Sequence, residues 1–290
     1  MIEPSQYAPS SARERTDHFC RQFGLRIPIL QAPMASASPP SLAAAVANAG
    51  GMGALGALVT SPQGIREWAS DFRSQSNGSF QLNVWIPDPP PVRNAEVEKR
   101  MREFLAGWGP PVAPEAGDAR MPDFDKQCEA FLEVAPPVVV PLIATGGIAD
   151  GRGVAAALIL GASAVQIGTA FLRCPEANIA RAWANALEEL EPEETISTRA
   201  FTGRLGRAIA TEYAVATTAP DAPEPAAYPV QRGLTANMRE LGQKTNDVNR
   251  MQAWAGQAAA LAREEPAAEF VHRVWNDAEQ LLPWGSGRYP

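Results

Sequence analysis

Cysteine and histidine are scarce in this chain of 290 residues. Its three cysteines, Cys20, Cys128 and Cys174, lack the spacing of a metal or redox motif, and an odd number without a regular pattern is typical of reduced thiols. Its two histidines, His18 and His272, stand alone, and surface or capping roles suit both. We therefore expect no metal site and a cytoplasmic protein.

An excess of positive charge and long apolar runs are missing as well. The net charge is −7 and the isoelectric point is about 5.1, which argues against a nucleic-acid or anionic-membrane surface. Residues 1–19 contain no apolar segment of signal-peptide length, and glycine, proline or charge interrupts the apolar stretches well before membrane-spanning length. The expected partners are therefore small molecules, not nucleic acids or membranes.

The first part of the chain alternates between strand and helix patterns. Apolar runs of strand length lie at Ile27–Gln31, Met52–Val59 and Phe80–Trp85. Helix patterns follow the first two runs, with Ser38 and Ser61 at the N-cap positions and a proline next in each. Alternation at this spacing is typical of a parallel sheet with its connecting helices.

The glycines of residues 51–56 match the literal pattern G-x-G-x-x-G. A dinucleotide site needs a strand, then the glycines, then a helix, whereas these glycines follow a helix pattern and open a strand pattern. We interpret them as a helix end and the start of a strand that packs closely on its neighbour.

The stretch from residue 141 to 172 points to a phosphate site. Two apolar runs, Pro141–Thr145 and Ala164–Ile167, flank an Ala-rich helix pattern at Val154–Leu160. The first run ends in Gly146–Gly147 and the second in Gly168–Thr169. Glycines at the carboxyl ends of parallel strands leave backbone N–H groups open to a phosphate, as at the last two strands of many βα-barrels. A phosphorylated cofactor is the expected ligand.

The alternating pattern then breaks. Pro136–Thr145 is one apolar run with an internal proline and is long for a single strand. We count five barrel-type strands in the sequence, whereas a closed βα-barrel needs eight. Later segments are more polar: a helical pattern at Pro175–Glu191, a Pro/Ala linker at Ala219–Pro229, a largely helical Gly233–Arg263 and a helix at Pro266–Leu281.

Eight short motifs, in order along the chain, resemble the nitronate monooxygenases, a family of FMN-dependent βα-barrel enzymes. The motifs are IPILQAPM (Ile27–Met34), AGGMGALG (Ala49–Gly56), FQLNVWIP (Phe80–Pro87), ATGGIADGRG (Ala144–Gly153), VQIGTAFL (Val165–Leu172), RAFTGRLGR (Arg199–Arg207), YPVQ (Tyr228–Gln231) and MQAWAGQ (Met251–Gln257).

The resemblance implies FMN as cofactor and a set of residues that bind it. Ala32, Pro33 and Met34 match the segment that lies against the flavin ring, and Asn83 matches an asparagine that hydrogen-bonds the cofactor. Trp254 and Gln257 match a family segment near the cofactor. The phosphate side of the site corresponds to Gly146, Gly147, Gln166, Gly168 and Thr169.

One family segment has no counterpart in this sequence. The family carries a catalytic histidine in a Gly-Gly-His-Arg-Gly context on the strand before the ATGG strand, and neither His18 nor His272 lies in such a context. We therefore name no catalytic residue. The fused run Pro136–Thr145 indicates an internal deletion of about three βα units, or roughly 70–90 residues if about 250 residues form eight units.

The resulting expectation is an α/β fold: an incomplete TIM-type βα-barrel with a mainly helical C-terminal lobe. We expect a truncated FMN-binding barrel at 20–175 completed by part of 245–265, a helical lobe and linker at 176–244, and a C-terminal helix and tail at 266–290. Because five strands cannot close a barrel, the open edges favour self-association or poor solubility.

The expected reaction is nitronate monooxygenation, in which an alkyl nitronate anion and O2 give a carbonyl compound and nitrite, with activity impaired by the missing histidine. One alternative is an FMN-dependent NAD(P)H:quinone or enoyl-thioester reductase on the same scaffold. Another is an inactive, phosphate-binding or structural remnant.

Overall fold

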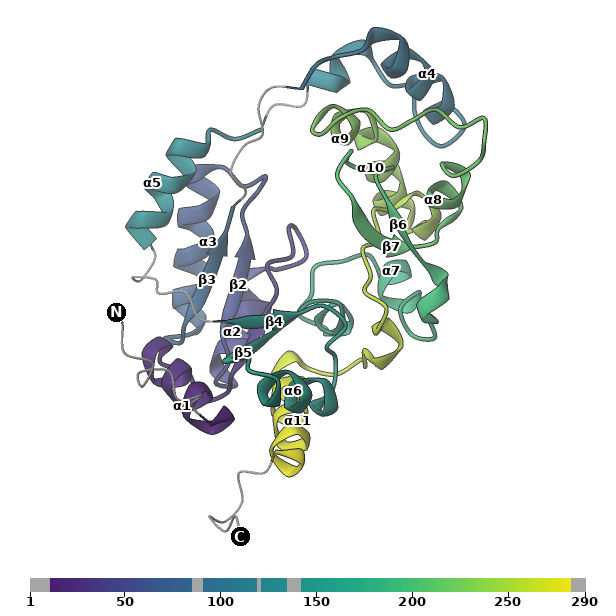
Figure 1. Cartoon of the computed structure of the whole chain (residues 1–290). Coiled ribbons are helices and arrows are strands. Elements are labelled where there is room, and N and C mark those ends of the chain that lie inside the picture. The colour runs from purple at the N-terminus through teal and green to yellow at the C-terminus, as the bar shows by residue number, and fades with distance from the viewer. Residues whose placement is uncertain (1–10, 85–90, 119–120, 135–141, 283–290) are drawn as a thin grey trace, which may run out of the picture. The chain divides into compact units, whose positions relative to one another are not determined.

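The computed structural model describes residues 11–84, 91–118, 121–134 and 142–282, and the chain divides into two compact units (Figure 1). The first, here called the strand unit, contains the parallel strands and the C-terminal helix. The second unit is formed by two separate segments of the chain. The strand unit comprises Met1–Val84, Asp125–Asn178 and Arg263–Pro290, and the second unit comprises Trp85–Phe124 and Ile179–Ala262.

Five parallel strands form the centre of the strand unit: β1 (Ile29–Gln31), β2 (Gly53–Gly56), β3 (Phe80–Asn83), β4 (Ile143–Thr145) and β5 (Ala164–Ile167). β5 pairs with both β1 and β4, and β2 pairs with β3. A parallel bridge between Leu30 and Met52 joins the two sets, so the order across the strands is β3-β2-β1-β5-β4. Because all five run the same way, their carboxyl ends lie at one edge of the sheet.

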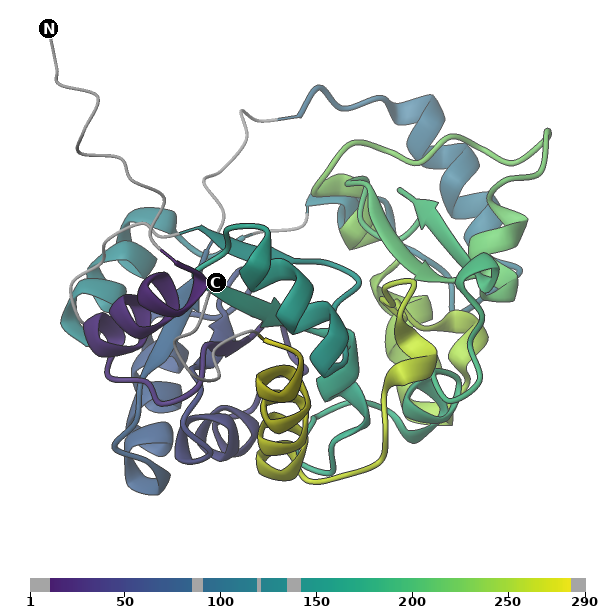
Figure 2. The ribbon, with the colours of Figure 1, turned by 60° about the horizontal axis from the view of Figure 1, so that its bottom comes forward.

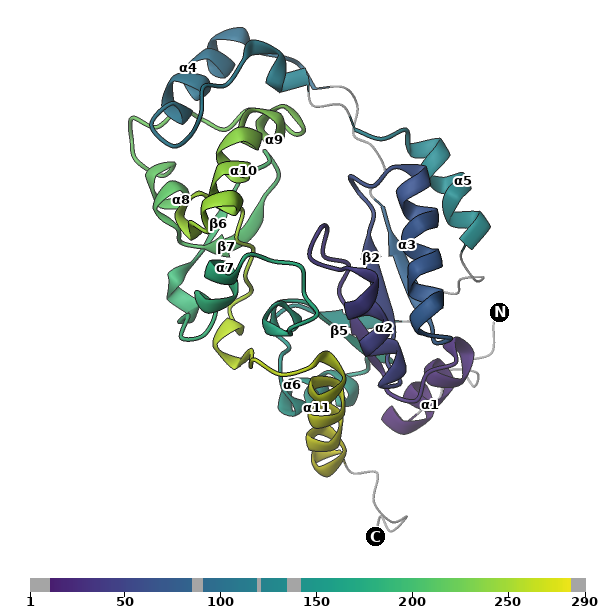
Figure 3. The same cartoon turned by 180° about the vertical axis from the view of Figure 1, so that it is seen from behind.

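Helices connect and cover these strands: α1 (Ala12–Phe23), α2 (Pro40–Asn48), α3 (Pro62–Gln75), α5 (Phe124–Val134), α6 (Gly151–Ile159), the 3₁₀ turn η3 (Thr169–Arg173) and α11 (Ala267–Leu281). α2 packs on α3 and on β2, as seen from behind in Figure 3. α11 packs on α6 and α2, and Figure 2 shows it beside α6. No described helix combines the length and apolar composition needed to cross a bilayer.

The starts of α3 and α6 follow local capping rules, whereas the start of α2 does not. The Ser61 hydroxyl accepts a hydrogen bond from the N–H of Gly64 at the start of α3, and Asp150 does the same for Gly153 at the start of α6. The predicted cap at Ser38 is wrong: Pro39 is the N-cap of α2 and supplies no side-chain bond. The Ser38 hydroxyl is instead bonded to residues at the end of β1.

The glycines of residues 51–56 lie where β2 packs closely on its neighbours, which confirms the interpretation from the sequence. Gly50 ends α2 with φ +104°, and β2 begins at Gly53. A Cβ at Gly51 would lie 2.5 Å from the carbonyl oxygen of Ile29, and one at Gly53 would lie 2.6 Å from that of Ala43. Side chains here would separate β2 from β1 and α2, so the motif serves packing.

The second unit contains helices and one antiparallel strand pair. The pair consists of β6 and β7, and its core includes the buried Phe201 and Tyr213. Its elements are α4 (Ala95–Leu105), η2 (Pro114–Asp118), α7 (Arg181–Asn185), η4 (Pro192–Glu194), β6 (Thr195–Thr198), β7 (Gly206–Ile209), α8 (Glu212–Ala216), α9 (Val230–Leu234), α10 (Ala236–Thr245), η5 (Val248–Arg250) and η6 (Ala259–Leu261).

Several sequence expectations for the later chain need correction. The helix expected over Pro175–Glu191 covers only Arg181–Asn185, and Gly233–Arg263 contains one α-helix of ten residues followed by 3₁₀ turns. The helix expected at Pro266–Leu281 is confirmed as α11. Of the apolar run Pro136–Thr145, residues 136–141 lie outside the described part of the chain, and β4 forms the end of the run.

Candidate functional site

The candidate site is the carboxyl-end edge of the parallel strands, where the structure gathers all nine residues predicted from the sequence. Residues 32–34 follow β1, Asn83 ends β3, Gly146 and Gly147 follow β4, and residues 166–169 end and follow β5. The register sets these ends side by side, because Gln31 is opposite Ile167 and Thr145 is opposite Gln166. The nine are Ala32, Pro33, Met34, Asn83, Gly146, Gly147, Gln166, Gly168 and Thr169.

Gly146 and Gly147 form an open backbone turn. Their φ values are +96° and +68°, in the left-handed region that favours glycine. A Cβ at either position would meet no atom within 4 Å, so there is room above the turn. Among the described residues, neither N–H donates a hydrogen bond. Two open N–H groups in such a turn fit the oxygens of a phosphate.

Gly168 brings the end of β5 against the segment after β1. A Cβ at Gly168 would lie 3.2 Å from the Cβ of Ala32 and 3.8 Å from the Sδ of Met34. The N–H of Ala32 also donates to the carbonyl oxygen of Ile167 over 2.7 Å. The predicted ring-side and phosphate-side segments therefore lie against each other, and a side chain at Gly168 would crowd the Ala32 methyl group.

Asn83 lies at the end of β3 with its side chain half-buried. Its carbonyl oxygen accepts a hydrogen bond from the N–H of Ala57 over 2.8 Å, whereas its side-chain amide has no hydrogen-bond partner within the described ranges. Gly56, opposite Asn83, allows the segment after β1 to cross the end of β2, because a Cβ there would lie 2.8 Å from the Ala35 nitrogen. Sequence reasoning treated Gly56 only as part of the glycine motif.

Sequence reasoning also missed a buried glutamine beneath the site. Gln31 is fully buried, and its side-chain amide donates to the Ser38 hydroxyl over 2.9 Å while its Oε1 accepts from the N–H of Ala54 over 3.2 Å. The same hydroxyl accepts from the N–H of Met34 over 3.2 Å. Ser38 and Gln31 therefore fix the turn after β1. The available signal was a glutamine at the end of an otherwise apolar strand.

A second glutamine links strands that are not neighbours. The Nε2 of Gln81 on β3 donates to the carbonyl oxygen of Gln31 over 2.9 Å and to the Oε1 of Gln166 on β5 over 3.0 Å. Strands three places apart in a flat sheet would be separated by roughly 14 Å. The sheet therefore curves, and these amides meet on its concave face.

One acidic residue flanks the glycine turn. Burial alone would raise the pKa of Asp150, but hydrogen bonds from the N–H of Gly153 and from Arg152 hold that pKa below its ordinary value. The Arg152 guanidinium lies 2.6 Å from the Asp150 carboxylate. A charged cap already occupies the start of α6, so the backbone N–H groups of Gly146 and Gly147 are better placed for an anion.

The histidines lie away from this edge. His18 is exposed on α1, which precedes β1. The Nε2 of His272 on α11 is 3.0 Å from the carbonyl oxygen of Ala49, at the end of α2 that leads into β2. Both therefore lie toward the amino ends of the strands. Trp254 and Gln257 belong to the second unit, where the Trp254 ring packs edge-on against Phe201.

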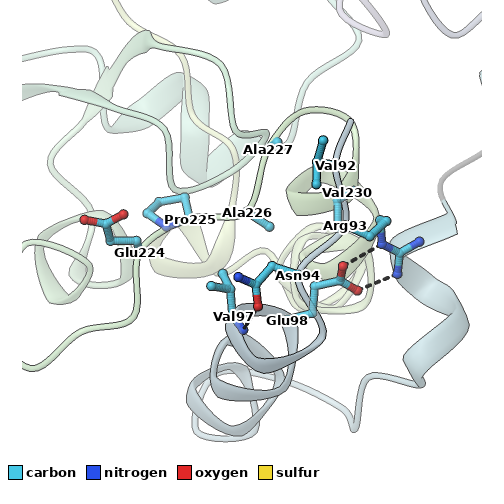
Figure 4. A pocket seen from close by; sticks show the side chains of 10 residues that line it. All are labelled: Val92, Arg93, Asn94, Val97, Glu98, Glu224, Pro225, Ala226, Ala227 and Val230. Carbon is cyan, nitrogen blue, oxygen red and sulfur yellow. Dashed lines mark hydrogen bonds and ion pairs between the residues drawn. The ribbon is translucent and has the colours of Figure 1, made fainter. Parts of the chain in front are cut away.

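The second unit has a pocket of its own, about 190 Å³ in volume (Figure 4). Three of its polar residues are engaged: Arg93 forms ion pairs with Glu98 and with Asp118, which lies outside the lining, and the Asn94 side chain caps α4. The Glu224 carboxylate has no partner among the described residues. The rest of the lining is mostly apolar, including Val92, Val97, Ala226 and Val230. The pocket therefore offers few unengaged polar groups to a ligand.

The family model and the curated relatives point to one family. The family model described as nitronate monooxygenase matches residues 18–139 and 114–277. A nitronate monooxygenase of Paraburkholderia phytofirmans is 31% identical over 346 positions, covering 90% of this chain and 94% of the relative. One of Pseudomonas aeruginosa is 28% identical over 349 positions, covering 89% and 98%. A solved nitroalkane oxidase structure from Streptomyces ansochromogenes has a TM-score of 0.77 and 26% identity, covering 88% of this chain and 96% of that one.

The family match spans both units, and the fold of the nitroalkane oxidase agrees with it. With the site residues at the carboxyl ends of parallel strands, sequence and architecture lead to the same conclusion: the chain belongs to the nitronate monooxygenase family and is, by family, an oxidoreductase flavoenzyme.

Proposed function

We propose that this chain binds FMN at the carboxyl-end edge of its strands and converts an alkyl nitronate and O2 into a carbonyl compound and nitrite. The observation that carries the proposal is the open turn at Gly146 and Gly147, next to the contact between Gly168 and Ala32. The relatives named nitronate monooxygenase support the reaction. FMN ends in a single phosphate, and this turn has the room and the donors for one.

Each part of the site has a role toward the cofactor. The N–H groups of Gly146 and Gly147 would bind the phosphate, and residues 32–34 would lie along the ring. The side-chain amides of Asn83 and Gln166 would bind polar atoms of the cofactor. When bound, the flavin supplies the electron transfer and oxygen chemistry, and the protein supplies placement.

The barrel of this chain is incomplete in our proposal. The alignment with the Paraburkholderia relative runs over 346 positions, whereas the chain has 290 residues, so at least 56 positions of that relative are opposite a gap. The two family matches overlap at residues 114–139, which fits a junction between distant parts of the family's barrel. The order β3-β2-β1-β5-β4 is what remains of a barrel when consecutive middle strands are removed.

Turnover is expected to be slow. The family's catalytic histidine would lie in the missing segment, and His18 and His272 lie toward the other ends of the strands. No residue of this chain is assigned to move a proton or to steer the anion near the ring. We expect FMN binding to be retained more fully than nitronate oxidation.

Two measurements on the purified chain test the proposal. FMN titration followed by flavin fluorescence should give saturable binding, and Gly147→Val should weaken it at least tenfold because valine strains a positive φ and its side chain fills the turn. Gly161→Val is the matched control, since Gly161 also has φ +116° and open space but lies at the far end of α6.

Oxygen uptake and nitrite release with an alkyl nitronate then test the reaction. Slow turnover supports the proposal in full, and turnover as fast as in intact relatives contradicts the expected impairment. Reduction of bound flavin by NADH without nitronate turnover would favour the reductase alternative. Absence of FMN binding at any concentration would reject the proposed cofactor and leave a structural remnant.

A further inference from the structure

Gln166 has a fixed orientation, and the cause is a neighbouring side chain. The Oε1 of Gln166 accepts a hydrogen bond from Gln81, and within the described part of the chain its Nε2 has no hydrogen-bond partner. An amide can turn by half a rotation and exchange its donor and acceptor ends. The hydrogen bond from Gln81 sets the orientation of Gln166, and the backbone of Gln31 orients Gln81 in turn.

The orientation begins at a backbone carbonyl. The oxygen of Gln31 can only accept, so the side of Gln81 that faces it over 2.9 Å must be the –NH2 group. That group has two hydrogens, and the second points at Gln166 over 3.0 Å. Only the Oε1 of Gln166 can accept it. The carbonyl of Gln31 thus determines the orientation of both amides.

The backbone carbonyl of Gln31, which orients both amides, is held rigidly. Gln31 is fully buried in β1, its strand pairs with β5 on one side, and its own side chain is bonded to Ser38 and Ala54. Its carbonyl oxygen therefore cannot turn away without breaking the end of β1. Gln81 is half-buried on β3 and reaches this oxygen across the concave face.

We propose that Gln81 is a positioning residue that makes Gln166 present its two N–H donors to the bound cofactor. This inference rests on the proposed FMN site. It predicts that Gln166 binds an acceptor atom of FMN and that Gln81 contributes to affinity only through Gln166. Without Gln81, the amide of Gln166 is free to turn and present either end.

A double-mutant cycle on FMN affinity separates this role from general support of the fold. Gln166→Met removes the donor, and we expect it to raise the FMN dissociation constant about tenfold, as for one lost hydrogen bond. Gln81→Met should raise it about three- to tenfold. In the double variant, the constant should equal that of Gln166→Met alone, because Gln81 then has nothing to orient.

A control variant and a second variant at position 81 separate loss of orientation from loss of folding. Gln63→Met removes an exposed glutamine of α3 whose side chain, within the described ranges, donates to Glu67, and it should leave the dissociation constant unchanged. If Gln81→Met does not fold, Gln81→Glu keeps the size of the side chain but removes both donors, so the bonds to the Gln31 carbonyl oxygen and to the Oε1 of Gln166 are lost. A carboxylate can only accept from Gln166, which favours the reversed amide and should also weaken binding. Circular dichroism melting of the apo chain checks the fold of each variant.

The outcomes separate the two proposals. If the effects of Gln81→Met and Gln166→Met on the dissociation constant multiply in the double variant, Gln81 acts independently and the inference is overturned. Unchanged FMN affinity in Gln81→Met would also overturn it. In both cases wild-type binding keeps the proposed function intact. Absence of FMN binding by the wild-type chain would reject both together.

Discussion

The two sides of the parallel sheet are covered very differently. On the β2–β3 side, α3 and α5 lie over the strands, and the buried rings of Trp68, Phe72 and Phe80 pack together with centroids 4.7–5.6 Å apart. On the β4 side, Ile143 and Ala144 are only half-buried and Thr145 is exposed. The strands are of similar length and direction, so the difference lies in what covers them.

The well-covered side also has polar ties between its layers. The Trp68 indole N–H donates to the carbonyl oxygen of Ser38 over 3.0 Å, and the buried Gln127 of α5 donates to the carbonyl oxygens of Ala57 and Thr60. Arg66 and Glu133 pair across α3 and α5. Such ties fix helices that local sequence alone would leave loosely placed.

The β4 side exposes apolar surface instead. Leu142 is 67% exposed and Leu160 is 87% exposed, and the carbonyl oxygen of Leu142 accepts a hydrogen bond from the N–H of Ser163, so the two leucines lie near the same end of β4 and β5. An edge strand bordered by apolar side chains is a site for association with other chains. Among the described residues, β4 is therefore an edge strand with less cover than β2 and β3.

The largest effect should come from the packed side. Phe72→Ala removes a fully buried ring from the aromatic cluster and should lower the free energy of unfolding by about 3–5 kcal/mol, measured by urea denaturation. Leu142→Ala is the contrasting variant and should change it by less than about 0.5 kcal/mol, because most of that side chain is already in water. Equal effects of the two variants would show that the sides do not differ in packing.

The parallel strands can be predicted from the sequence better than the contacts that cover them. The apolar runs at Ile27–Gln31 and Ala164–Ile167, bounded by proline and glycine, specify buried strands with little competition, and the glycine turns after β4 and β5 follow from the same pattern. Parallel strands then place those turns on one edge. The candidate site follows from these local signals and from the family resemblance.

The parts that were missed depend on contacts that a local sequence pattern does not contain. Ser38 has the local features of an N-cap, but Gln31 and Met34 bind its hydroxyl instead. The bond from Gln81 to Gln166 needs a curved sheet, which single-strand patterns do not contain. Antiparallel β6 and β7 are four residues each in polar surroundings, so the sequence expectation there was helix and linker.

A smaller effect is expected from the exposed leucines. Leu160→Glu should shift the chain from self-associated species toward monomer and raise its soluble concentration several-fold, because charge on an apolar edge opposes association. Size-exclusion chromatography with light scattering measures the change. Leu132→Glu, which alters an exposed leucine on the covered side, is the matched control and should do less. A wild-type chain that is monomeric at all concentrations would contradict the prediction.

The smallest effect concerns the helix that supports the β4 side. α6 starts at the Asp150 cap, and hydrogen bonds hold the pKa of that carboxyl below its ordinary value of about 3.9. A lowered pKa in the folded state means that Asp150 stabilises the fold above its ordinary pKa, and that this contribution fades as the pH falls through the folded-state pKa.

At pH 7, Asp150→Ala should lower the free energy of unfolding by about 1 kcal/mol, whereas Asp150→Asn keeps a capping oxygen and should lower it less. Between pH 5 and 3, thermal melting should show the wild type losing more stability than Asp150→Asn. Identical losses would mean that Arg152 and the N–H of Gly153 do not stabilise the charged carboxylate, and that the β4 side depends on apolar contacts of α6 with α11 alone.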